Sequence, residues 1–194
     1  MYMDKGIKKI LIVTGDFVED YEIMVPFQSL QILGFEVDVV CPDKKKGDKI
    51  KTSIHQFKEG CQTYTEECGH EFTLNATFSS IKADDYMGLV IPGGRAPEYL
   101  RQDKRVLELI EKFKNRPIAC VAHGIQLLTA TKMTQGKRVA CYPGCRAEVE
   151  SVGGEFIEPT QNEAIVDGNL ITAQNYHGHI DCLRSFYKVM MVNQ

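Results

Sequence analysis

The chain has 194 residues, of which 43% are hydrophobic and 25% are charged, and its formal net charge is −3. Domains typically hold about 100–200 residues, so this length and composition predict one globular domain with a sizeable core. The acidic balance offers no basic surface for a phosphate backbone, which argues against nucleic acid as a partner. The longest apolar runs are too short to span a bilayer, which argues against a membrane protein.

The seven cysteines are an odd number, and residues 1–6 contain no signal-peptide apolar region. We therefore expect reduced thiols and a cytoplasmic location. The nearest approach to a metal cluster is Cys61, Cys68 and His70. It has no C-x-x-C pair and no obvious fourth ligand, so no metal site is predicted.

The N-terminal part of the sequence alternates strand and helix patterns. Residues 9–13 form a continuous apolar run, typical of a strand covered on both faces of a parallel sheet. A helix is predicted over about 21–33 and a second strand over 35–40. The buried stripe of this helix is expected to comprise Val25, Leu30 and Leu33.

Residues 43–80 interrupt the alternation. They open with the charged turn Asp-Lys-Lys-Lys-Gly-Asp and continue with short β-like pieces such as residues 70–74. We interpret this segment as an excursion from the sheet, such as a hairpin, and not as a separate domain.

The alternation resumes at residue 87. The expected strands are 87–91, 117–121, 139–142, 164–166 and 170–173, and the expected helices are 97–114, one beginning in 124–130, 147–152 and 179–191. The last two strands flank Asp167-Gly168-Asn169, a strong hairpin turn. Repeated β–α units imply a parallel sheet with right-handed crossovers and helices on both faces. The predicted fold class is therefore α/β, a flavodoxin-like doubly wound sheet in one domain over residues 1–194.

Three loops leave the carboxyl ends of predicted strands, where open parallel sheets bind their ligands. They are residues 15–20, residues 93–98 and the turn Ala122-His123-Gly124. In the third, a strand runs into a helix with no loop between them, which is the geometry of a nucleophile elbow. A helix N-terminus at this point favours a thiolate or a developing oxyanion. A plain strand–helix junction with a buried histidine is the alternative.

Four segments resemble the ThiJ/PfpI family in their order along the chain. They are Phe-Val-Glu-Asp-Tyr-Glu (17–22), Pro-Gly-Gly-Arg-Ala-Pro-Glu (92–98), Pro-Ile-Ala-Cys-Val-Ala-His-Gly (117–124) and Cys-Tyr-Pro-Gly-Cys-Arg (141–146). This family contains parkinsonism-associated deglycases, glyoxalase III enzymes and proteins once described as intracellular cysteine peptidases. The resemblance covers almost the whole chain and implies a fold like that of class I glutamine amidotransferases. Residues 75–78, Asn-Ala-Thr-Phe, resemble the glyoxalase-like branch found in plants.

The resemblance also implies catalytic roles. A cysteine nucleophile is expected at the elbow position that Ala122 occupies here, followed by His123. By position, Glu19 would hydrogen-bond that cysteine. Glu98 would pair with the histidine, often across a subunit interface, so a homodimer or larger homo-oligomer is expected.

For substrate binding, the resemblance implies backbone N–H groups near Gly93 and Gly94 as the oxyanion site. Arg95 and Tyr142 are further candidate substrate contacts, because both follow strand ends at the same rim. The implied reaction converts a small aldehyde such as methylglyoxal into lactate through a hemithioacetal, without cofactor or metal.

Ala122 departs from the family pattern, because a methyl group cannot attack a carbonyl carbon. Cys120 faces the same side of the strand but lies roughly 6–7 Å back, so buried packing is its expected role. An engineered Cys→Ala substitution and a natural chain without the nucleophile both remain open. The leading hypothesis is a glyoxalase III or deglycase-like site that is disabled or altered. The alternatives are a non-catalytic member that binds a metabolite or protein in a stress or chaperone-like role and, more weakly, a cysteine peptidase.

Overall fold

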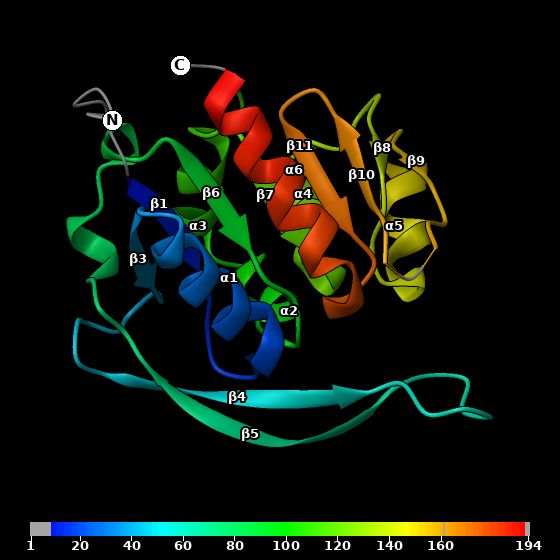
Figure 1. Cartoon of the computed structure of the whole chain (residues 1–194), viewed down its shortest axis with the longest axis horizontal. Coiled ribbons are helices and arrows are strands. Elements are labelled where there is room, and N and C mark those ends of the chain that lie inside the picture. Colours follow the sequence, from blue (N-terminus) through cyan, green and yellow to red (C-terminus); the bar gives the residue numbers. More distant parts are fainter. Residues whose placement is uncertain (1–8, 161, 193–194) are drawn as a thin grey trace.

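The computed structural model describes residues 9–160 and 162–192. Its centre is a six-stranded sheet with the order β10-β11-β7-β6-β1-β3 (Figure 1). The strands are β1 (Lys9–Val13), β3 (Glu36–Val40), β6 (Gly88–Ile91), β7 (Ile118–Val121), β10 (Ala164–Asp167) and β11 (Leu170–Ala173). Neighbouring strands are parallel except β10, which pairs antiparallel with β11 through the predicted hairpin turn. The predicted α/β fold is confirmed.

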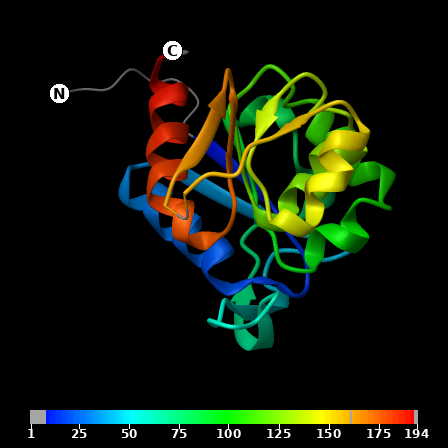
Figure 2. The ribbon, with the colours of Figure 1, turned by 90° about the vertical axis from the view of Figure 1, so that its right-hand side faces the viewer.

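Helices cover both faces of this sheet (Figures 1 and 2). Helices α1 (Asp20–Ile32) and α6 (His179–Val192) lie on one face; α2 (Ala96–Leu100), α3 (Lys104–Glu111) and α4 (Ile125–Ala130) lie on the other. Beside them, α5 (Arg146–Ser151) accompanies a short parallel pair, β8 (Arg138–Val139) and β9 (Glu155–Phe156). Five 3₁₀ turns complete the elements: Phe78–Ser80, Ala83–Asp85, Ala122–Gly124, Pro143–Cys145 and Tyr176–Gly178. Within the described ranges, no helix combines the length and apolarity that a bilayer crossing requires.

The apolar strands form the core because both of their faces are covered. Every residue of β6, β7 and β11 is buried, and so are the last four residues of β1. A continuous apolar strand can only be stable where helices remove both of its faces from water. This is the reason that these segments could be recognised from their sequence.

The segment 43–80 contains a long antiparallel hairpin, β4 (Lys49–Gln56) and β5 (Thr65–Thr73). A two-residue strand in the first βα loop, β2 (Val18–Glu19), pairs with β4. The hairpin forms a separate layer below the main sheet, across the end toward which β6 points (Figure 1). The interpretation as an excursion is confirmed, and the excursion reaches the end of the sheet that carries the candidate site.

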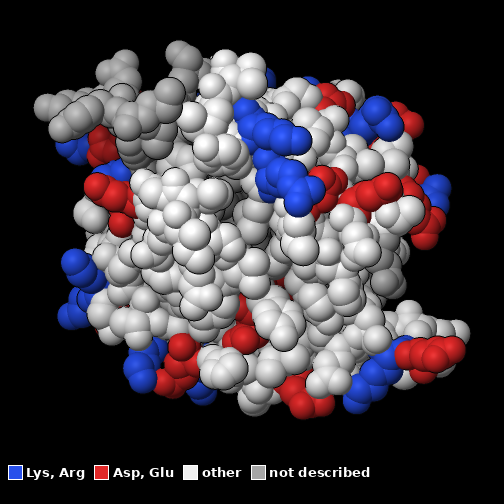
Figure 3. Space-filling model, viewed as in Figure 1, with Lys and Arg blue, Asp and Glu red and all other residues white. Residues whose placement is uncertain are grey.

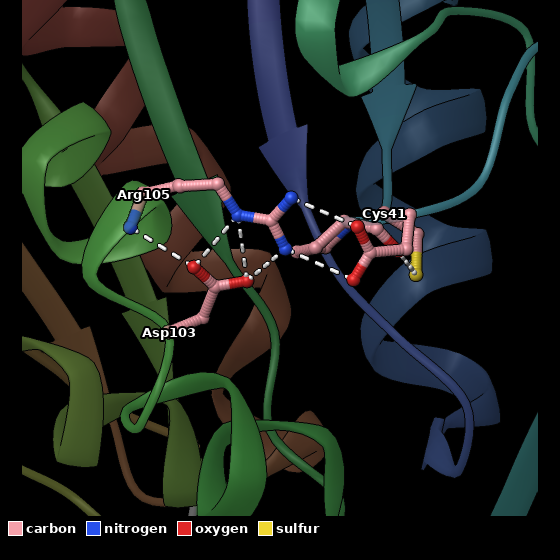
Figure 4. A network of polar contacts seen from close by, with 5 residues as sticks. Cys41, Asp103 and Arg105 are labelled. Atoms are coloured by element: carbon pink, nitrogen blue, oxygen red, sulfur yellow. Dashed lines mark hydrogen bonds and ion pairs between the residues drawn. The ribbon is translucent and has the colours of Figure 1, made fainter.

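The helix expected over 97–114 is two helices. Asp103 has an extended backbone (φ −89°, ψ 108°), and its carboxylate accepts a hydrogen bond from the Arg105 N–H at 2.9 Å, so α3 starts anew after it. The Arg105 guanidinium lies between the carboxylates of Asp103 and Asp43, which ties α3 to the loop after β3 near Cys41 (Figure 4). An internal cap, and not the apolar periodicity, sets this break.

The stripe predicted for the first helix also needs a correction. Leu33 lies just after the end of α1 and is 44% exposed, and Val25 is only half-buried. The residues of α1 that reach the core are Ile23, Pro26 and Leu30. Because Glu22 is also buried on this helix, the inward face is set partly by a polar residue, which an apolar pattern cannot reveal.

Candidate active site

The turn after β7 is a strained elbow. Val121 ends the strand in an extended conformation, and Ala122 then adopts φ +50°, in the left-handed region that residues other than glycine rarely enter. The 3₁₀ turn Ala122–Gly124 leads directly into α4. A β-carbon at Gly124 would lie 2.6 Å from the Ile91 carbonyl oxygen, so only glycine permits this close packing. The predicted strand–turn–helix is confirmed.

The carboxyl group beside Ala122 belongs to Glu22. Its Oε2 accepts a hydrogen bond from the Gly93 N–H at 2.7 Å, and the side chain is 2% exposed. A β-carbon placed on Gly93 would lie 2.6 Å from this oxygen and 2.9 Å from the Ala122 Cβ. Glu22 and Ala122 therefore meet at Gly93.

Glu19, which was expected to contact the elbow residue, has a different place. It is the N-cap of α1: its Oε2 accepts from the Glu22 N–H at 2.9 Å, and its Oε1 accepts from the His55 N–H at 3.4 Å. Because α1 begins only at Asp20, the residue directed at the elbow is Glu22, three positions after Glu19. The structure thus moves the candidate acid from Glu19 to Glu22.

Burial changes the acidity of both carboxyl groups. It raises the pKa of Glu19 to about 7, although the backbone N–H groups of Glu22 and His55 oppose the shift. Burial raises the pKa of Glu22 well above its usual value, and the nearby Glu19 carboxyl adds to the shift. Desolvation penalises the charged form, so burial favours a protonated carboxylic acid at Glu22, beside the elbow.

His123 lies in an aromatic cluster and is 7% exposed. Its ring stacks on Tyr142 with centroids 4.6 Å apart and meets Tyr64 edge-on at 5.8 Å. Burial and the neighbouring His55 lower its pKa to about 4, so the imidazole is neutral at physiological pH. Its Nδ1 is buried and has no hydrogen-bond partner among the described residues.

The β4–β5 hairpin covers the aromatic cluster around His123, and the sequence did not predict this contact. The Thr63 and Tyr142 hydroxyls are 2.7 Å apart and share a hydrogen bond. The His55 ring stacks on Tyr64 at 4.0 Å, and the Tyr176 hydroxyl donates to the His55 carbonyl oxygen. The sequence signal for this contact was the presence of aromatic residues and histidine in a segment that was interpreted only as an excursion from the sheet.

The loop after β6 contributes the other expected binding residues. Gly94 has φ +74°, and a β-carbon there would lie 2.3 Å from the Glu19 backbone nitrogen, so glycine lets the two loops touch. The Gly93 N–H, predicted as an oxyanion donor, is occupied by Glu22. The Arg95 guanidinium lies over the Phe17 ring, 4.3 Å from its centroid. The loop after β6 borders the elbow, because a β-carbon at Gly93 would lie 2.9 Å from the His123 nitrogen, and the first βα loop contacts it at Gly94.

Glu98 is exposed on α2. The aromatic neighbours of His123 within the chain are Tyr142, Tyr64 and His55, so the structure does not bring Glu98 and His123 together in one chain. Its pairing with a histidine across a subunit interface stays a prediction.

Residues 8–188 match the model of the DJ-1/PfpI family. The chain belongs to this family. It is 45% identical over 186 residues to Protein DJ-1 homolog D of Arabidopsis thaliana, covering 94% of this chain and 48% of the relative. It is 28% identical to Deglycase PfpI of Pyrococcus furiosus, covering 94% of this chain and 99% of that protein. The chain spans about half the length of the Arabidopsis relatives it matches.

Solved structures of the DJ-1/PfpI family share the fold. Drosophila melanogaster DJ-1beta superposes with a TM-score of 0.77 over 95% of this chain and 91% of its own, at 16% sequence identity. Schizosaccharomyces pombe DJ-1 gives a TM-score of 0.74 at 20% identity, over 93% of this chain and 91% of its own. These similarities support the architecture of the sheet and its helices.

For a DJ-1/PfpI chain with alanine at the elbow, Cys120 is the nearest thiol along the strand. It is 1% exposed, and burial raises its pKa well above the usual value, so a thiolate is disfavoured there. A cavity of about 200 Å³ opens on the outer side of Tyr142 and Thr63, and neither Ala122 nor His123 lines it. The turn itself thus has no reactive sulfur.

Proposed function

We propose that the elbow is a site for small reactive carbonyl compounds, of the deglycase and glyoxalase III type, and that Ala122 leaves it without a nucleophile. The observation that carries this proposal is the strained Ala122 with the buried carboxyl group of Glu22 held beside it at Gly93. A left-handed non-glycine residue costs about 1–3 kcal/mol, and such strain concentrates at functional sites. The deglycase names of several relatives support the substrate class.

The proposed chemistry depends on one atom that Ala122 lacks, the sulfur of a cysteine side chain. With a cysteine at the elbow, the thiol sulfur would bond to the aldehyde carbon, and the thiol proton would pass to the carbonyl oxygen. Glu22 as an acid and His123 as a neutral base are the proton carriers beside that position. In the chain as it stands, a carbonyl compound would be held by these groups without a covalent bond.

The second candidate is a non-catalytic member that binds a metabolite or a protein partner. Ala122 itself favours this function, because the other elbow features are present while the nucleophile is not. A cysteine peptidase is the weakest candidate, since that reaction needs the same thiol.

Restoring the thiol separates these candidates. We expect Ala122→Cys to convert methylglyoxal into lactate at least about 100-fold faster than the unchanged chain. Adding Glu22→Gln to that variant should lower the rate by about 100-fold, because the proton carrier is lost. Lactate formation is the measurement, and Ala122→Ser serves as the control for size. A folded Ala122→Cys variant without turnover would contradict the carbonyl proposal.

We further propose self-association and a cytoplasmic location. All seven cysteines lie within the described residues and are free thiols, which suits a reducing compartment. The exposed carboxyl group of Glu98 on α2 is available to a second copy of the chain.

A further inference from the structure

Arg95 is the cation of the loop after β6, and the β4–β5 hairpin supplies its partner. The Arg95 Nη2 lies 2.8 Å from Glu66 Oε1, and its Nε donates to Glu66 Oε2 at 3.1 Å. Two parallel contacts of this kind match the guanidinium fork to a carboxylate. The same guanidinium rests on the Phe17 ring, so its position is fixed on two sides. Glu66 thus both orients and neutralises Arg95.

Glu66 is also connected to the elbow. Its Oε2 lies 3.1 Å from the His55 Nε2, and the His55 ring is 6.4 Å from the His123 ring. The Glu66 side chain is 26% exposed, so water screens its charge only in part. The charge reaches His123, where it opposes the larger effect of burial on the pKa. The Glu66 charge therefore contributes to the field at the elbow, and the Arg95 charge acts on the neighbouring His55.

Two guanidinium groups near the elbow have carboxylate partners, and only that of Arg95 belongs to the hairpin. Glu148 is paired with Arg101 at 2.9 Å, so the second nearby cation is already compensated. Burial raises the pKa of Glu22 and disfavours its charged form, so this carboxyl group offers no cation to an anionic ligand. An Arg95 without Glu66 would present a guanidinium fork suited to a ligand carboxylate.

We propose that Glu66 is a specificity-determining residue of this site: by occupying Arg95, it selects neutral carbonyl compounds over those that carry a carboxylate. The inference rests on the proposed carbonyl function and adds to it the charge of the substrate. Methylglyoxal and pyruvate share the group CH₃–CO. Methylglyoxal carries an aldehyde where pyruvate carries a carboxylate, so the proposal predicts that the site binds methylglyoxal in preference to pyruvate.

Ligand titration of the unchanged chain and of Glu66→Gln tests the proposal without needing turnover. The probes are pyruvate as the anion and hydroxyacetone as the neutral analogue, followed through the ring signals of His123 by NMR. Removing one charge near a partly buried site should tighten pyruvate binding about tenfold. Hydroxyacetone affinity should stay within about twofold, because a neutral ligand gains little from the field. Glutamine keeps the length of the side chain and one acceptor oxygen, which preserves the position of the hairpin, but it can no longer pair both edges of the Arg95 guanidinium or neutralise its charge.

Glu67→Gln is the matched control, because Glu67 is the next residue of β5, is exposed and bonds only to Gln56 among the described side chains. It removes the same charge and should leave pyruvate binding unchanged. The double variant Glu66→Gln/Arg95→Gln should lose the gain.

Three results would overturn the proposal: no pyruvate binding by Glu66→Gln, an equal gain in Glu67→Gln, or a gain that survives loss of Arg95. The test is independent of the carbonyl chemistry. If Ala122→Cys shows no turnover while Glu66→Gln tightens pyruvate through Arg95, only the proposed function fails. If Ala122→Cys is active while pyruvate affinity stays constant, only the role of Glu66 fails.

Discussion

Glu19 and His123 give the folded chain opposite dependences on pH. The pKa of Glu19 is raised from 4.5 to about 7, so between these values the folded state holds a proton that the unfolded state releases. Its contribution to the free energy of unfolding therefore falls as the pH rises through this window. The pKa of His123 is lowered from 6.5 to about 4, so the unfolded state binds the extra proton. Its contribution falls as the pH drops from 6.5 to 4.

Substituting Glu19 or His123 should remove its own contribution to the pH dependence of the unfolding free energy and leave that of the other residue. Relative to the unchanged chain, Glu19→Gln should gain up to about 3 kcal/mol of unfolding free energy between pH 4.5 and 7, and His123→Gln should gain a similar amount between pH 6.5 and 4. Urea unfolding at several pH values measures both differences. Glu67→Gln, at an exposed position, is the control. If the differences for Glu19→Gln and His123→Gln do not change with pH, the pKa values of these two side chains are not shifted by folding.

At the scale of elements, the break between α2 and α3 depends on one cap. Replacing Asp103 by Ala removes the acceptor for the Arg105 N–H and one of the two carboxylates that hold the Arg105 guanidinium. We expect Asp103→Ala to lower the free energy of unfolding by about 1 kcal/mol, as N-cap losses do. Asp103→Asn keeps a good cap and should restore most of that loss. Chemical denaturation measures both, and equal destabilisation by the two variants would contradict the capping role.

The break between α2 and α3 is a feature that apolar periodicity in the sequence could not predict. The apolar residues continue through 100–113, so periodicity alone favoured one helix. The competing signal was local, an aspartate able to accept from a backbone N–H two residues later. The turn at Ala122 was predictable for the opposite reason, because a buried strand there meets a helix with no intervening residues.

At the scale of the whole molecule, two observations favour self-association. Much of the surface over α1 is uncharged, whereas Lys and Arg side chains stand over α6 and other charged side chains lie toward the edge (Figure 3). These two helices also expose Ile32, Ile180 and Val192. Exposed apolar side chains of this kind are common where protein surfaces meet.

Light scattering should therefore give a mass of at least twice the chain mass of 21.9 kDa. Dilution should shift the mass toward the monomer if the assembly is reversible. A mass of one chain at every concentration would contradict self-association and remove the role expected for Glu98.

The sequence by itself determined the alternation of strands and helices outside residues 43–80, the place of the elbow and the alanine within it. These features are local: a strand covered on both faces needs a continuous apolar run, and a strand–helix turn needs no distant residue. Only the tertiary structure decided which acid faces Ala122, since the exact start of α1 turns Glu22 and not Glu19 toward it. The contact of Arg95 with Glu66, 29 positions away, likewise depends on the path of the hairpin across the end of the sheet. No local pattern encodes that path, because it results from packing between segments distant in the chain.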